Sequence, residues 1–146
     1  MGKYRRLTRE ELHAVEAEFV RYLASESITS DDWEKKLSTD APEVEGSLDA
    51  FSEQFWDGAT GAIDCLEHQP TPGDLWLFHF TELTAHVIHC VHEDGIATWS
   101  QGGKQYEAEA RGREIFLLLE QGAKPCDEDR FKAVQAEMIA GINVPD

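Results

Sequence analysis

The stretch LWLFHFTELTAHVIHCVH, residues 75–92, decides the fold class of this chain. It contains two apolar runs of strand length, residues 75–80 and 84–92, with a short polar break between them. The second run includes Val87, Ile88 and Val91, whose branched side chains suit the pleated surface of a sheet. Strands that follow one another so closely pair most simply in the antiparallel direction. The stretch therefore predicts the centre of a small antiparallel sheet.

Two further strands are expected beside this pair. Residues 63–68 precede the turn PTPGD, and residues 96–99 follow the turn Glu93-Asp94-Gly95. Residues 104–110 fit either an edge strand or a helical extension, and the pattern leaves that choice open. The prediction is a sheet of about four strands.

Helical patterns occupy both ends of the chain. Residues 8–26 begin with Thr8 and Glu11 at the spacing of a capping box, and apolar residues then recur at steps of three and four. Further helix starts lie at 29–32 and 40–43, and residues 113–121 and 127–140 carry the last helices. We therefore predict an α+β fold in one domain over residues 1–146, helical in 1–60, mainly β in 61–110 and helical in 111–146.

The charge balance limits the partners of this chain. It has 29 acidic residues against 13 Lys and Arg, a formal net charge of −16. Nucleic acids and anionic membranes would be repelled. The surface suits solubility, a basic protein partner or mimicry of a nucleic acid. The basic residues Lys3, Arg5, Arg6 and Arg9 are expected to fold back onto the chain's own carboxylates.

The cysteines and the N-terminus indicate a cytoplasmic protein. Cys65, Cys90 and Cys126 are odd in number, widely spaced and without a CxxC motif, unlike a secreted disulfide scaffold. The basic start lacks the apolar stretch of a signal peptide, and no apolar run approaches the ~20 residues of a membrane helix.

The histidines and cysteines of the middle strands are the candidates for chemistry. Because side chains alternate along a strand, His86, Cys90 and His92 are expected on one face, with His79 joining them from the neighbouring strand. Nitrogen and sulfur ligands of this kind suit tetrahedral zinc. The alternatives are a sheet that displays histidines without a metal, a pH sensor, and a Cys–His nucleophile pair at Cys65 or Cys90.

Several segments resemble a family of small bacterial proteins of unknown function. The N-terminal KYRRLT-x-EEL motif at residues 3–12 carries the resemblance most strongly, and residues 28–35, 66–68 and 113–123 are similar to the family as well. The resemblance implies one compact α+β domain. It implies no activity and supplies no catalytic residues.

The leading functional hypothesis is a non-enzymatic protein-interaction or regulatory module, inhibitor- or immunity-like toward a basic partner and needing no cofactor. The alternative is a zinc-binding protein or metal-dependent hydrolase that uses His79, His86, Cys90 and His92. The sequence leaves the oligomeric state open.

Overall fold

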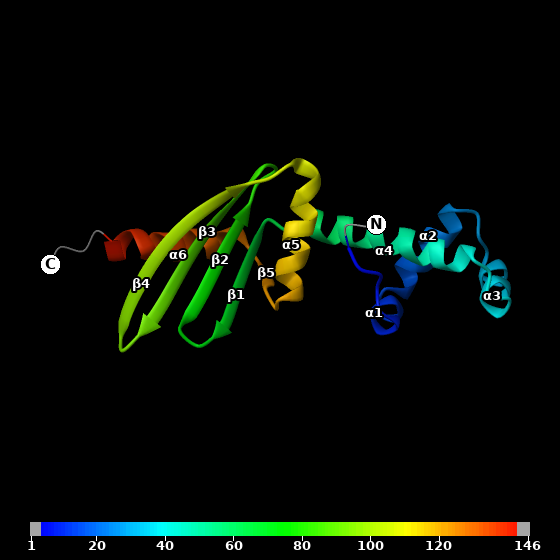
Figure 1. Cartoon of the computed structure of the whole chain (residues 1–146), viewed down its shortest axis with the longest axis horizontal. Coiled ribbons are helices and arrows are strands. Elements are labelled where there is room, and N and C mark those ends of the chain that lie inside the picture. Colours follow the sequence, from blue (N-terminus) through cyan, green and yellow to red (C-terminus); the bar gives the residue numbers. More distant parts are fainter. Residues whose placement is uncertain (1–3, 143–146) are drawn as a thin grey trace. The chain divides into compact units, whose positions relative to one another are not determined.

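The computed structural model describes residues 4–142, which begin with helices and continue in the sequence with an antiparallel sheet and further helices (Figure 1). The predicted α+β class is confirmed, although the sheet has five strands and not four. The described residues divide into two compact units, one ending at Gly58 and the other beginning at Ala59. Whether both fold together as one cooperative domain stays a prediction.

The first unit is built from helices. They are α1 (Arg9–Ala14), α2 (Glu16–Ser25), α3 (Ser30–Ser38) and α4 (Glu43–Gly61), of which α4 continues into the first residues of the second unit. The single helix predicted over 8–26 is interrupted at Val15, whose backbone leaves the helical region with φ −113° and ψ 29°. The capping box predicted at Thr8 and Glu11 is present, and Thr29 and Asp32 form a second one.

An aromatic core holds the helical unit together. Leu7, Phe19, Leu23 and Phe51 are buried at its centre. The Phe19 ring lies 5.0 Å from the Phe51 ring and 5.2 Å from that of Trp33, spacings at which aromatic pairs add to the hydrophobic effect.

Two residues of the basic start, Arg5 and Arg6, pair with carboxylates of the chain, as predicted. Arg5 donates to Glu11 at 2.6 Å, and Arg6 contacts Asp49 at 2.7 Å and also Glu45. Lys3 lies outside the described residues. These ion pairs use the positive charge of Arg5 and Arg6 within the helical unit.

The second unit is a sheet with one helix on each face. Its strands are β1 (Cys65–Thr71), β2 (Asp74–Phe80), β3 (Thr84–Glu93), β4 (Ile96–Gln105) and β5 (Lys124–Cys126), in the order β4-β3-β2-β1-β5. Residues 104–110, which fitted either an edge strand or a helical extension, contain both. The strand β4 runs to Gln105, and a 3₁₀ turn, η1, follows at Ala108–Ala110. The remaining helices are α5 (Arg111–Glu120) and α6 (Glu128–Ile142).

Alternation along the strands divides the apolar side chains between the two helices. On one face, Cys65, Leu77 and Ile88 pack against Phe131, Val134 and Met138 of α6. On the other face, Leu66, Phe80 and Ala85 pack with Ile115 of α5 and Ala123. The strands β1, β2 and β3 therefore each contribute to two small cores, and α6 and α5 each cover one of them.

Candidate functional site

The four residues predicted as metal ligands lie on the same face of the sheet but in two separate places. His79 and His86 stand directly opposite one another on β2 and β3. Cys90 lies farther along β3, with its sulfur 4.0 Å from Nδ1 of His92. Ile88, which is fully buried, lies between the two pairs on this face. Within residues 4–142, no three His, Cys, Asp or Glu side chains are arranged to hold a metal ion.

His89 lies on the opposite face of β3 from this set. Its ring stacks on Trp76 with 3.6 Å between ring centroids, and its Nε2 lies 2.6 Å from Oδ1 of Asp74. An imidazole that is held by a carboxylate on one side and a ring on the other is fixed in orientation.

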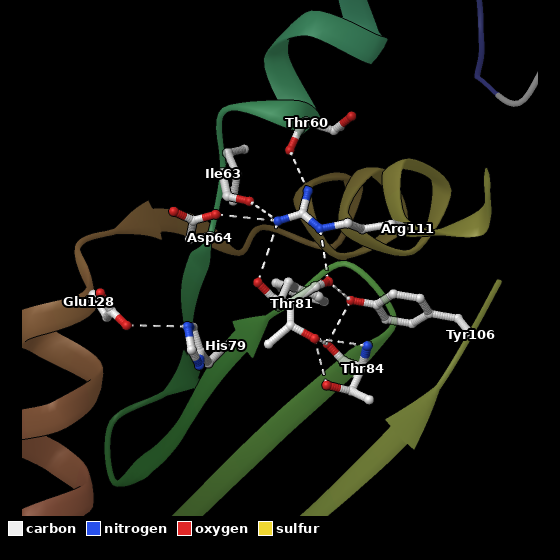
Figure 2. A network of polar contacts seen from close by, with 10 residues as sticks. Thr60, Ile63, Asp64, His79, Thr81, Thr84, Tyr106, Arg111 and Glu128 are labelled. Atoms are coloured by element: carbon white, nitrogen blue, oxygen red, sulfur yellow. Dashed lines mark hydrogen bonds and ion pairs between the residues drawn. The ribbon is translucent and has the colours of Figure 1, made fainter. Parts of the chain in front are cut away.

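A row of His and Cys side chains crosses the sheet beside the start of α6. His86, His79, Cys65 and Cys126 occupy successive strands at paired positions. Glu128, in the first turn of α6, places Oε1 3.6 Å from Nε2 of His79 (Figure 2). Sequence reasoning missed Cys126 because β5 is only three residues long, too short to show a period.

The thiols of this row are protected from ionisation. Cys65 is fully buried, and burial raises the pKa of its thiol to about 11, with nearby Cys126 and Glu128 acting in the same direction. Burial also raises the pKa of Cys90 and Cys126. Because the thiolate is the nucleophilic form, the arrangement does not activate Cys65 or Cys90 for covalent catalysis at neutral pH.

Arg111 forms a second polar centre, which joins the end of α4 to the strands (Figure 2). Its guanidinium donates to the carbonyl oxygens of Ile63 at 2.7 Å and Thr81 at 3.1 Å. It reaches the carbonyl oxygens of Thr60 and Phe80 and the carboxylate of Asp64 at 3.3 to 3.4 Å. Since its donors are directed to backbone carbonyls, we interpret Arg111 as a structural residue.

The helical unit carries a groove between α2 and α3. It encloses about 420 Å³. Its lining consists of a mainly apolar set, Phe19, Val20, Leu23, Ala24, Ile28 and Trp33, with Thr29 and Ser30 beside them and the carboxylates Glu16 and Glu34. Val20 remains 50% exposed although its neighbours Phe19 and Leu23 are buried. The groove thus combines an apolar lining with negative charge.

Sequence reasoning identified the residues of this groove only as the apolar side of two helices. The helical period predicts that Phe19 and Leu23 face a core. It does not predict that Val20 stays 50% exposed beside them in the lining of a groove. The acidic composition was the one signal that pointed toward a basic partner.

Comparison with known proteins finds similarity to a family of unknown function (DUF6495), whose model matches residues 1–98. The matched range includes the helical unit, the strands β1 to β3 and the first residues of β4. No curated protein and no solved structure matches the chain. Within residues 4–142, no helix has the length and apolar character needed to cross a membrane.

Proposed function

This chain belongs to a family of unknown function (DUF6495), and we propose that it is a cytoplasmic protein-interaction module that binds a basic, amphipathic helix of a protein partner. The binding site is the groove between α2 and α3. The observation that carries the proposal is the combination in one groove of an exposed apolar lining with Glu16 and Glu34.

The apolar lining of the groove supports a helical ligand. Amphipathic helices are recognised by apolar grooves into which they insert residues spaced three or four apart. Val20 offers uncovered apolar surface to such a residue, and Trp33 lines the same groove. Burial of apolar surface contributes about 25 cal/mol per Å², so even a few inserted side chains supply useful affinity.

The charge of the unit supports a basic ligand. Residues 1–58 contain fourteen Asp and Glu against seven Lys and Arg, and part of that positive charge is already paired within the unit. A ligand helix with Lys or Arg on its polar face would reach Glu16 and Glu34 while its apolar face enters the groove. Complementary charge of this kind mainly accelerates association and selects the partner.

An inhibitor- or immunity-like role follows if the bound helix is the part of the partner that contacts the partner's own substrate. A basic surface that contacts an acidic substrate loses that contact once the groove covers it. The proposal therefore extends to neutralisation of a basic protein.

Fluorescence anisotropy of a labelled Leu/Lys peptide with helical periodicity tests the groove. We expect binding that weakens as salt is raised, because the charges involved are exposed and screened. A Leu/Glu peptide of the same pattern should not bind. Binding of both peptides alike would contradict the proposal.

A matched pair of variants locates the binding. Val20→Asp places a charge in the groove, and Leu37→Asp places one on a side chain that is equally exposed, 51% against 50%, but does not line the groove. We expect Val20→Asp to weaken peptide binding about tenfold or more, the equivalent of ~1.4 kcal/mol, and Leu37→Asp to leave it unchanged. Equal effects of both changes would place the site elsewhere.

Neutralising the groove carboxylates isolates the electrostatic part. The double change Glu16→Gln with Glu34→Gln should reduce the salt dependence of binding, whereas two neutralised glutamates outside the groove, Glu10→Gln with Glu18→Gln, should have a smaller effect. Retained salt dependence in the first variant would show that the general charge of the chain, and not the groove, attracts the peptide.

A metal-dependent role at His79, His86, Cys90 and His92 is the second candidate. The direct pairing of His79 with His86, with Glu128 3.6 Å from His79, favours it. The distance between this pair and Cys90 disfavours a single ion bound by all four. Elemental analysis of the purified protein decides, since one equivalent of zinc that is lost in a His79→Ala variant would support the metal site.

A further inference from the structure

The two edges of the sheet differ in how they are protected. The β5 edge is only three residues long and contains Pro125, both of which hinder the addition of another strand. The other edge strand is β4 (Figure 1). It is ten residues long, has no proline and carries a single charge, at Lys104. Within residues 4–142, β4 pairs with β3 alone. The chain therefore leaves one long edge open to strand addition.

The backbone groups that this open edge presents can be assigned. The N–H of Tyr106, just past β4, donates to the carbonyl of Leu83 at 3.0 Å. Because hydrogen-bonded residues alternate along an antiparallel strand, the even-numbered residues of β4 bond to β3. Its odd-numbered residues, Ala97, Trp99, Gln101, Gly103 and Gln105, direct their N–H and C=O groups outward.

We propose that a second copy of this chain adds to the β4 edge, antiparallel, with a two-fold axis at Trp99. The outward groups require odd-numbered residues to pair with odd-numbered ones. Pairing Trp99 with Trp99 of the second copy satisfies this and sets Ala97 opposite Gln101. It also sets Ile96 opposite Gly102, and symmetry repeats that pairing on the other side of the axis.

The side chains complement one another in this register. Ile96 is 67% exposed and projects from the face of the sheet on which Gly102 lies. A hollow of about 330 Å³ surrounds Gly102, lined by Trp76, Val87 and His89 among others, and a Cβ added at Gly102 would meet no atom within 4 Å. Ile96 of each copy can therefore enter the hollow of the other.

The charges also favour β4 over the remaining surface for self-association. Two copies with a net charge of −16 each repel one another, but β4 itself contains no Asp or Glu. The proposed register sets Lys104 opposite Asp94 of the second copy. Lys104 already contacts Glu114 at 2.6 Å, so the ammonium would lie between two carboxylates.

Sedimentation velocity across a range of protein concentrations and salt tests the dimer. We expect a species of twice the 16.5 kDa monomer mass whose population rises with salt, because screening weakens the general repulsion. A protein that remains monomeric at all concentrations and salts would overturn the proposal. So would a dimer that dissociates as salt is raised.

Variants of the contact pair give a second test. Ile96→Lys and Gly102→Val should each abolish the dimer, the first by removing the inserted side chain and the second by filling the hollow. Leu117→Lys alters another exposed apolar residue of the same unit, 43% exposed on α5, and should leave the dimer intact. A dimer that survives Ile96→Lys would refute pairing at β4.

The outcome is separate from that of the proposed function. Peptide binding to the helical unit weakens with salt, whereas the dimer strengthens. Ile96→Lys should leave peptide binding unchanged, and Val20→Asp should leave the dimer unchanged. Either proposal can therefore fail while the other stands.

Discussion

Replacement of Arg111 by methionine should destabilise the second unit by about 2–4 kcal/mol. The side chain is only 16% exposed, and its two shortest bonds go to the carbonyl oxygens of Ile63 and Thr81. A hydrogen bond from a charged donor contributes about 1.5–3 kcal/mol, and a buried group left without its partner costs about 1–3 kcal/mol.

The loss of the guanidinium affects the carbonyl oxygens of Ile63 and Thr81 to different degrees. Thr81 keeps the hydroxyl of Tyr106, which donates to it at 2.6 Å. Ile63 loses the donor at 2.7 Å. The figure of about 2–4 kcal/mol therefore corresponds to one strong bond lost in full and several longer ones lost in part. Methionine retains most of the apolar stem, so the change isolates the guanidinium.

Two companion variants separate the backbone bonds from the ion pair. Arg111→Lys keeps the charge but not the planar fork, and should cost about 1–2 kcal/mol. Asp64→Asn removes a carboxylate that is 74% exposed and 3.4 Å from the guanidinium, and should cost less than about 0.5 kcal/mol because exposed ion pairs contribute little.

Urea denaturation measures the free energy of unfolding, and hydrogen exchange locates the loss. We expect faster exchange in the end of α4, the start of β1 and the β2–β3 turn, which Arg111 joins (Figure 2). Equal losses for Arg111→Met and Asp64→Asn would refute the reasoning, because the ion pair and not the carbonyl bonds would then carry the stabilisation.

Three further predictions concern single sites. The hydrogen bond from Arg5 lowers the pKa of Glu11 from 4.5 to about 2. The contribution of the Glu11 carboxylate to stability is therefore present above pH ~4.5 and is lost as the pH falls toward ~2. An acid titration of the stability of Glu11→Gln should lack that loss. Gly73→Ala should destabilise more than Gly95→Ala in thermal melts, because both glycines have positive φ but only a Cβ at residue 73 would approach a backbone oxygen, at 2.8 Å. Cys126 is the cysteine that is not fully buried, so it should react first with a thiol reagent in the native protein. Mass spectrometry measures the labelling rates. Equally fast labelling of Cys65 and Cys90 would contradict their burial.

Local signals account for most of the fold that could be predicted. The capping pair at Thr8 and Glu11 placed a helix start correctly, and the aromatic and β-branched runs placed β2 and β3. Such signals lie within a few residues of one another, so they require no knowledge of the tertiary structure. The three residues of β5 are a strand only because β1 lies beside them, and no local pattern reveals that.

The candidate site shows the same limit. Alternation along β3 correctly set His86 and Cys90 on one face, but four residues of strand span roughly 13 Å, too far for ligands of one ion. The partners that lie near His79, namely Cys65 and Glu128, come from other parts of the chain. Likewise, the role of Arg111 depends on where four distant carbonyls meet.

The late position of α6 in the chain has a consequence during synthesis. The residues that cover Leu77 and Ile88 begin at Phe131, forty-three positions after Ile88. At about 5–20 residues per second, the ribosome takes roughly 2–9 s to make that interval. During that interval the newly synthesised hairpins expose an apolar surface. A chaperone that binds unfolded chains could hold this surface until α6 has been made.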